Sequence, residues 1–226
     1  MSESVMTHII ARIRTDFPTK FGIPRQSGLA DVPARIVFEP EYRNADALRG
    51  IEEYSHLWLI WQFSEAVRDT WSPTVRPPKL GGNRRVGVFA TRSPFRPNAI
   101  GLSSVRLERV EQSEALGPVL HVCGADLMDG TPIFDIKPYL AYTDSHPEAS
   151  GSFALTGDAV RVECAEGVLD ALPQDKRETL LRVLAQDPRP GYQHEAGRVY
   201  GFPFGGFEVR FTVADGVLTV LSAEKA

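Results

Sequence analysis

Hydrophobic and polar residues alternate along much of the chain, which is the pattern of strands that bury one face. This alternation predicts strands at residues 5–15, 34–40, 86–90, 100–110, 118–127 and 131–140. The run "SHLWLIWQF" at 55–63 is continuously apolar and rich in aromatic residues, which predicts a strand buried on both faces. One short helix is expected at 44–54, with Asn44 as its cap.

Segments rich in proline and glycine separate these strands. Two of them are "FPTKFGIPRQSGLADVP" at 17–33 and "WSPTVRPPKLGGNRR" at 71–85. Loops of this length in a compact domain are usually functional or disordered. Many strands with little helix between them indicate a sheet that curls into a barrel.

The composition changes near residue 145. The segment "YTDSHPEASGSFALTGDA" at 142–159 is small, polar and turn-forming, as expected of a linker. Beyond it, apolar residues at helical spacing predict a helix at 175–186, which the prolines of "DPRPGY" end. Residues 205–223 have the pattern of a hairpin with Asp215-Gly216 as the turn.

We therefore predict a mainly β protein with two domains. The first, at 1–148, is a β-barrel-like domain that contains the polar loops. The second, at 149–226, is a small α+β domain.

The composition of the 226 residues is that of a soluble globular protein, since 42% are hydrophobic and 24% are charged. No apolar run approaches the roughly 20 residues that span a bilayer, and the N-terminal alternation begins too early for a signal peptide. We expect a cytoplasmic protein with no membrane partner. Two cysteines far apart and five histidines at no ligand spacing predict that no metal is bound.

Charge is distributed unevenly, and the net charge of −4 taken alone argues against a nucleic-acid partner. Residues 68–109 contain nine basic and two acidic side chains, a balance of +7. Residues 111–170 contain eleven acidic and two basic side chains, a balance of −9. This asymmetry predicts a positive patch on an acidic protein. The alternative is ordinary solvated charge on the strand faces.

Motifs of several enzyme classes are missing from the sequence. It contains no G-x-x-x-x-G-K-[ST], no G-x-G-x-x-G after a strand and no G-x-S-x-G. Three unusual polar loops remain: "GIPRQSG" (22–28), "ATRSPFRPNAIG" (90–101) and "DLMDGTPIFDIKPY" (126–139). In the 90–101 loop, two prolines fix the backbone and hold the arginines in a set arrangement, which suits phosphate or carboxylate recognition.

The 126–139 loop carries three carboxylates, Asp126, Asp129 and Asp135. Carboxylates near one another can bind a cation, orient an amine or a ribose hydroxyl, or act as a base. For Asp129 the alternative is a turn carboxylate that bonds its own backbone, because "DGTP" has good turn chemistry.

Six stretches, in one order over nearly the whole chain, resemble the TrmO family of tRNA methyltransferases. They are "IPRQSGLA", "SHLWLIWQF", "WSPTVRPPKLGGN", "GVFATRSPFRPNAIGLS", "DGTPIFDIKPYL" and "LAQDPRPGY". The resemblance implies a single-sheeted β-barrel with a small C-terminal domain, working as a homodimer. It also implies an S-adenosylmethionine-dependent enzyme that methylates the exocyclic amine of threonylcarbamoyl-adenosine at position 37, in the anticodon loop of a threonine tRNA.

The resemblance assigns cofactor contacts to the three polar loops and to the segment after the aromatic strand. These residues are Pro24, Arg25, Gln26, Ser64, Glu65, Arg92, Leu102, Asp126, Leu127, Met128 and Asp129. Ser64 and Glu65 stand where some family members have His-Gln, so the contact expected there is through the backbone. Ala99 stands where a proline is common in the family.

Methyl transfer to an adenine amine predicts a carboxylate that accepts a hydrogen bond from this weak nucleophile, and we expect Asp129 or Asp135 in that role. The arginines outside the cofactor contacts are expected to meet RNA phosphate, and the C-terminal domain is expected to position the tRNA. The expected RNA contacts are Arg84, Arg85, Arg96, Arg189 and Tyr192.

The sequence is also compatible with two other functions. A module that binds S-adenosylmethionine and RNA without methyl transfer is one, and the departure at Ser64 and Glu65 is the sequence feature in its favour. A small-molecule methyltransferase is the other, and it leaves the positive patch unexplained.

Overall fold

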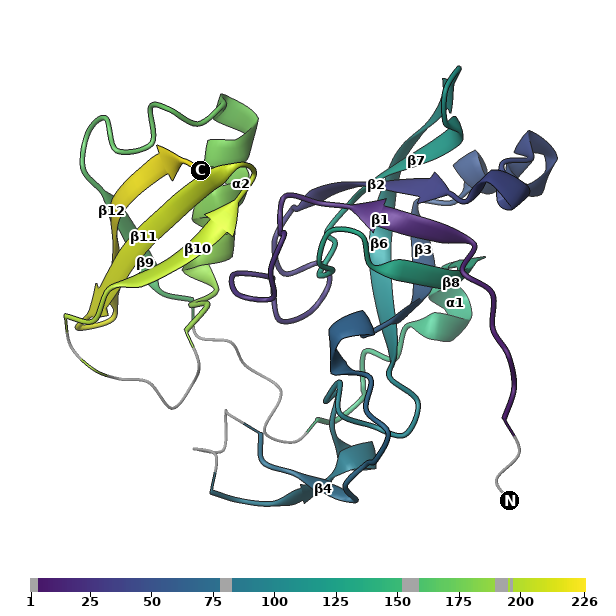
Figure 1. The fold of residues 1–226 in the computed structure, drawn as a ribbon, viewed down its shortest axis with the longest axis horizontal. Coiled ribbons are helices and arrows are strands. Elements are labelled where there is room, and N and C mark those ends of the chain that lie inside the picture. The colour runs from purple at the N-terminus through teal and green to yellow at the C-terminus, as the bar shows by residue number, and fades with distance from the viewer. Residues whose placement is uncertain (1–3, 78–82, 152–158, 190–194, 196) are drawn as a thin grey trace.

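The computed structural model describes residues 4–77, 83–151, 159–189, 195 and 197–226. Figure 1 shows a barrel, an irregular arm beside it and a smaller sheet that packs on a helix. We call residues 67–77 and 83–99 the arm. The strands are β1 (Ala11–Arg14), β2 (Pro33–Phe38), β3 (His56–Gln62), β4 (Thr74–Val75), β5 (Val86–Gly87), β6 (Ile100–Ser113), β7 (Gly117–Cys123), β8 (Pro132–Pro138), β9 (Arg161–Cys164), β10 (Tyr200–Phe204), β11 (Phe207–Ala214) and β12 (Val217–Lys225). The α-helices are α1 (Ala141–Asp144) and α2 (Gln174–Ala185).

The larger sheet closes on itself in the order β1-β2-β7-β6-β3-β8, because each strand pairs with two antiparallel neighbours. Alternate side chains point inward along each strand. The fully buried interior residues include Ile13, Ile36, Leu59, Leu120 and Ile133. The mainly β class is therefore confirmed, and the packed interior fixes the strand ends from which the polar loops leave.

The aromatic strand β3 is not buried on both faces, so that expectation is wrong. Its residues alternate between buried and half-buried, because only one face of a closed barrel meets the interior. On the other face, Trp58 Nε1 donates a hydrogen bond to Asp144 Oδ2 of α1 (2.7 Å). An apolar run thus covers the barrel core on one side and packs against a surface helix on the other.

Two further local expectations are wrong. Residues 44–54 form two 3-10 turns, at Ala45–Leu48 and Ile51–Glu53, because Gly50 at φ +85° interrupts the helix between them. Residues 86–90 pair as a strand only at Val86–Gly87 and then turn.

The C-terminal sheet has the order β10-β11-β12-β9, and its aromatic residues share one hydrophobic core with α2. The expected hairpin is confirmed, since β11 and β12 are joined by Asp215 (φ +48°) and Gly216 (φ +76°). The short strand β9, parallel to β12, was not expected. Among the described residues, no helix is long and apolar enough to cross a membrane.

The loop between β1 and β2, residues 15–32, joins the two parts of the molecule. It inserts Phe17 into the C-terminal core, where its ring lies 5.3 Å from that of Phe204. Gly22, at φ +90°, lies against Phe202, whose ring would be 2.4 Å from an added Cβ. The loop that carries Pro24, Arg25 and Gln26 is therefore held by the C-terminal core as well as by the barrel.

Candidate functional site

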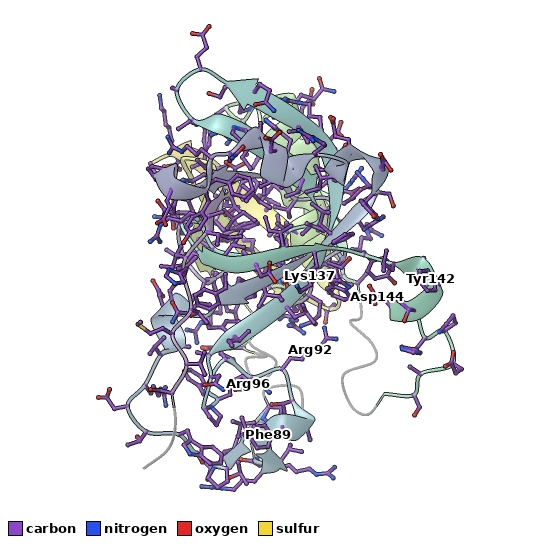
Figure 2. All side chains as sticks on the ribbon, turned by 90° about the vertical axis from the view of Figure 1, so that its right-hand side faces the viewer. Phe89, Arg92, Arg96, Lys137, Tyr142 and Asp144 are labelled. Carbon is purple, nitrogen blue, oxygen red and sulfur yellow. The ribbon has the colours of Figure 1, made fainter. Side chains whose placement is uncertain are left out.

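The three polar loops meet around one cavity of about 1050 Å³, which we call the first cavity. The 22–28 loop contributes Gln26, the 90–101 loop contributes Arg92 and Arg96, and the 126–139 loop contributes Asp126. In Figure 2, Arg92 and Arg96 lie on the side of the arm nearer the barrel strands, above Phe89. Residues far apart in the sequence thus form one site.

Most residues to which the resemblance assigns cofactor contacts line the first cavity. They are Pro24, Arg25, Gln26, Ser64, Glu65, Arg92, Leu102, Asp126 and Met128. Leu127 is 1% exposed and belongs to the barrel core instead. Asp129 is also absent from the described lining.

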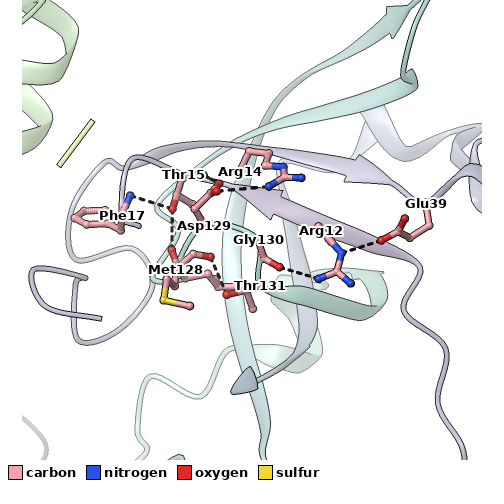
Figure 3. Close-up of polar contacts among 10 residues, drawn as sticks. Arg12, Arg14, Thr15, Phe17, Glu39, Met128, Asp129, Gly130 and Thr131 are labelled. Atoms are coloured by element: carbon pink, nitrogen blue, oxygen red, sulfur yellow. Dashed lines mark hydrogen bonds and ion pairs between the residues drawn. The ribbon is translucent and has the colours of Figure 1, made fainter. Parts of the chain in front are cut away.

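Asp129 and Asp135 were expected to face the acceptor amine, and the structure places neither in the lining of the first cavity. Asp129 Oδ1 accepts a hydrogen bond from the backbone N–H of Thr15 (3.1 Å), and its Oδ2 lies 3.5 Å from Arg14 Nη1 (Figure 3). Asp135 pairs with Lys137 Nζ (2.8 Å). Asp129 is thus a structural carboxylate that ties the 126–139 loop to the end of β1.

Asp126 is the aspartate of this loop that does line the first cavity. Ser103 Oγ donates a hydrogen bond to Asp126 Oδ1 (2.6 Å) and accepts one from Trp61 Nε1 (2.9 Å). Gly101 leaves room for this arrangement, because an added Cβ would lie 2.3 Å from the Trp61 ring. Burial raises the pKa of Asp126, and the hydrogen bond from Ser103 opposes that rise. Strands β3 and β6 therefore hold the carboxylate in place.

Arginines from two loops form one wall of the first cavity. Arg92 Nη1 donates a hydrogen bond to Gln26 Oε1. Arg25 Nη2 donates to the backbone carbonyls of Asp187 and Arg189, each at 2.9 Å. Since those carbonyls belong to the C-terminal "DPRP" segment, this wall is built by both parts of the molecule.

Arg189 was expected to contact RNA, and the structure gives its guanidinium a protein partner. It donates two hydrogen bonds of 2.8 Å to the carboxylate of Asp187, and its side chain is 13% exposed. Burial by itself raises the pKa of Asp187, but the hydrogen bonds and the charge of Arg189 outweigh it and leave that pKa below its ordinary value. The pair therefore stabilises the segment on which Arg25 rests.

Three of the other expected RNA contacts lie on the arm. Arg84 is exposed, and Arg85 Nη1 donates a hydrogen bond to Thr74 Oγ1 (3.1 Å). Arg96 Nη1 donates to the carbonyl of Thr91 (3.1 Å). Tyr192 lies outside the described residues.

A second cavity, of about 1210 Å³, adjoins the first. Arg25, Gln26 and Arg92 line both cavities, so they form a shared wall. From the arm, Trp71 lines the second cavity alone and Phe89 lines both cavities. Neither residue had a role predicted from the sequence. The signal that marks them is large aromatic residues in a polar, proline-rich segment.

The first cavity suits a ligand that has an aromatic base and both signs of charge. Trp61 and Phe63, with ring centroids 4.2 Å apart, supply an apolar wall. Arg92 can pair with a carboxylate, while Glu65 can accept hydrogen bonds from hydroxyl or cationic groups. S-adenosylmethionine has all of these parts. Among the described residues, no cluster of histidine, cysteine, aspartate and glutamate could hold a metal ion.

Comparison with known proteins gives matches along both parts of the chain. The model of the tRNA-methyltransferase O N-terminal domain matches residues 12–145, and that of the TrmO C-terminal domain matches residues 158–226. The tRNA (adenine(37)-N6)-methyltransferase of Escherichia coli is 42% identical over 226 residues, which cover 95% of this chain and 96% of that protein. A probable S-adenosyl-L-methionine-binding protein of Methanothermobacter thermautotrophicus is 35% identical over 133 residues, 59% of this chain and 88% of that protein. The crystal structure of TrmO from Pseudomonas aeruginosa superposes with a TM-score of 0.81 at 33% identity, covering 100% of this chain and 99% of that one.

Proposed function

Because the chain belongs to the TrmO family, we infer that it is an S-adenosylmethionine-dependent tRNA methyltransferase that modifies the N6 amine of adenine 37. The observation that carries this function is similarity over nearly the whole chain to an enzyme of that name. The module that binds without methyl transfer is not favoured, since the E. coli relative, similar along both parts of the chain, is named as an enzyme.

The first cavity is proposed to hold the cofactor. Arg92, stiffened by the neighbouring Pro94 and oriented by Gln26, binds the cofactor carboxylate. Trp61 and Phe63 provide the apolar wall for the adenine ring. When bound, S-adenosylmethionine supplies a methyl group that is already activated on a sulfonium.

Asp126 is proposed to orient the acceptor. An adenine amine is a weak nucleophile, because its lone pair is delocalised into the ring. A carboxylate that accepts a hydrogen bond from this amine places the nitrogen and increases its electron density as the new bond forms. Asp126 has the position for this role, since it lines the cavity and Ser103 holds its Oδ1 by a hydrogen bond.

Several finer statements are part of the same proposal. The acceptor is threonylcarbamoyl-adenosine in a threonine tRNA, and the enzyme works in the cytoplasm as a homodimer. The β-barrel-like domain at 1–148 carries the cofactor and the domain at 149–226 positions the tRNA. Arg25 lines both cavities and donates hydrogen bonds to the "DPRP" carbonyls, and this link between the C-terminal domain and the shared wall supports a role for that domain beside the tRNA.

Two measurements test the function. Purified protein with tritiated S-adenosylmethionine and unfractionated tRNA is expected to incorporate label, and mass spectrometry is expected to locate the methyl group at position 37. In tRNA from a deletion strain, the methyl group at position 37 is expected to be missing and to return with the gene. If label enters no RNA, or enters at another position, the proposed function is wrong.

A further inference from the structure

The second cavity exposes two large aromatic side chains that have no described role. Trp71 is 52% exposed and Phe89 is 73% exposed. Their ring centroids lie 6.1 Å apart, with an interplanar angle of 34°, so they form one apolar surface on the arm. Neighbouring exposed aromatic side chains of this size mark binding surfaces in soluble proteins.

The charge around this surface is positive. The described basic residues that line the second cavity are all arginines, and no described residue of that lining is acidic. The guanidinium of Arg68 lies 3.9 Å from the centroid of the Phe95 ring, so a flat cation covers a third aromatic side chain. The arginines are Arg25, Arg68, Arg76, Arg85, Arg92 and Arg96.

These features favour RNA over a second copy of the chain. Single-stranded nucleic acid is bound by aromatic and guanidinium planes on which bases stack, within a basic groove that follows the phosphates. A two-fold contact between copies over this cavity would instead bring the same arginines toward one another. With no carboxylate in the described lining, that repulsion would be uncompensated.

The second cavity lies directly beside the first cavity. Arg25, Gln26 and Arg92 separate it from the first cavity, where the cofactor is proposed to lie. A base that receives a methyl group must leave the stack of the loop, while the bases beside it need another surface to stack on. An RNA loop held in the second cavity would have its target base at this shared wall.

We propose that the second cavity receives the anticodon loop, with Trp71 and Phe89 stacking on bases that flank the methylated adenine and the arm arginines other than Arg92 binding phosphates. This inference rests on the proposed function. It identifies the arm as the substrate-binding element and separates stacking residues from charge residues within it.

The test uses the full chain and a synthetic anticodon stem-loop RNA, with binding measured by fluorescence anisotropy over a range of salt concentrations. Trp71→Ala and Phe89→Ala are each expected to weaken RNA binding about 5- to 100-fold, because base–aromatic stacking is lost. The slope of log K against log salt is expected to stay unchanged in both. Arg76→Ala is expected to lower that slope by about one, as for a lost phosphate contact.

Controls separate stacking from other effects. Tyr142 is 88% exposed on α1, away from Phe89 (Figure 2), so Tyr142→Ala is expected to bind RNA like the wild type. Phe89→Leu keeps an apolar side chain without a flat ring and is expected to bind as weakly as Phe89→Ala. Cofactor binding, measured by calorimetry, is expected to stay unchanged in the Trp71 variant, which also shows that it folds.

Three results would overturn the inference. One is unchanged RNA affinity in both aromatic variants while the wild type still methylates tRNA, which leaves the proposed function intact. Another is that Phe89→Ala weakens RNA binding while Phe89→Leu binds RNA as tightly as the wild type. The third is that the Trp71→Ala or Phe89→Ala variant sediments as a monomer where the wild type sediments as a dimer, while its RNA affinity per chain is unchanged. That result would make the cavity a contact between copies. A wild type that neither binds nor methylates RNA would instead contradict the proposed function.

Discussion

The two cavities share a wall, yet they differ in what supports them and in the charge they present. The first cavity is lined by barrel strands as well as by part of the arm, and its carboxylate Asp126 is held by the fully buried Ser103. The second cavity rests on the arm, where β4 and β5 pair over only two residues each. The first cavity therefore has a packed core behind part of its lining, whereas most of the lining of the second cavity comes from short, exposed segments.

This difference matches the two ligands that methyl transfer to RNA requires. A small cofactor must be held in one geometry, which rigid strands provide. An RNA loop has an irregular backbone, which exposed arginines and aromatic side chains on a loop can follow. In this chain the carboxylate Asp126 is held by barrel strands, whereas the adaptable surface for RNA lies on the arm.

Asp126→Asn is expected to have the largest effect. Loss of the carboxylate lowers the rate of methyl transfer about 10²- to 10⁴-fold, the range for a positioned general acid or base. Because burial raises the pKa of Asp126, the wild-type rate is expected to rise with pH through a value above the ordinary aspartate pKa, and the variant loses that rise. Single-turnover rates at several pH values measure both effects.

Cofactor affinity in Asp126→Asn decides the role of the residue. It is expected to stay close to that of the wild type, because the amide keeps the hydrogen bond with Ser103. A loss of cofactor binding as large as the loss of rate would make Asp126 a cofactor ligand and remove it from the chemistry.

Arg92→Ala is expected to weaken S-adenosylmethionine about 10- to 100-fold, as for a lost charge-assisted hydrogen bond. Calorimetry in the presence of a chelator measures this and also tests for metal-independent binding. Since Arg92 lines both cavities, RNA affinity serves as the comparison and is expected to fall less. A larger effect on RNA than on cofactor would reverse the assignment.

The double change Arg84→Ala and Arg85→Ala is expected to act on RNA alone. It weakens tRNA binding and lowers the salt slope by about one or two, because exposed arginines contribute through phosphate contacts. Cofactor affinity is expected to be unchanged, since neither residue lines the first cavity. If the pair governs cofactor binding while Arg92 governs RNA, the separation of the two cavities fails.

Arg189→Ala is expected to lower stability by about 1–3 kcal/mol through the lost hydrogen bonds to Asp187. The pKa of Asp187 is lower in the folded protein than in the unfolded chain, so its charged form stabilises the folded state at pH values above the unfolded pKa. This contribution to stability is lost as the pH falls through the folded pKa. The variant is expected to lose that acid-side dependence in denaturant titrations.

The Arg189 variant also tests the division between the domains. It is expected to keep its cofactor affinity and to methylate tRNA more slowly, because the backbone carbonyls that hold Arg25 remain. An equal loss of cofactor binding and turnover would show that both domains form one site.

Asp129→Asn is expected to have the smallest effect. Its contact with Arg14 is partly exposed, and such pairs contribute about 0–1 kcal/mol. The rate of methyl transfer is expected to match the wild type in the assay used for Asp126→Asn. A loss as large as that of Asp126→Asn would return Asp129 to the role that the sequence suggested for it.

Local patterns were sufficient for much of the fold. Alternation located the barrel strands, although it overextended 86–90, and the Asp-Gly pair located the C-terminal turn. These features depend on neighbours in the sequence, which is why they can be predicted from it. The partial exposure of the outer face of β3 could not be predicted, because it depends on how far α1 and other elements cover that face.

The functional site could likewise be predicted only in part from local sequence. The three polar loops were identified from their proline, arginine and aspartate residues, and they do meet at one cavity. The sequence did not say which of three aspartates faces it, because Asp126, Asp129 and Asp135 have equal chemistry. They differ in their partners, which are Ser103 on β6 for Asp126, the backbone of Thr15 after β1 for Asp129, and Lys137 on the same strand β8 for Asp135.

The sequence alone was sufficient to predict the mainly β class, the family resemblance and the segments that build the first cavity. Tertiary structure alone decided that Asp126 lines that cavity, that Arg189 pairs with Asp187, and that the aromatic residues of the arm face a second cavity beside it. The physical reason is that residue type and local spacing set what a segment can form. Burial, charge partners and a perturbed pKa arise only when distant strands and loops pack together.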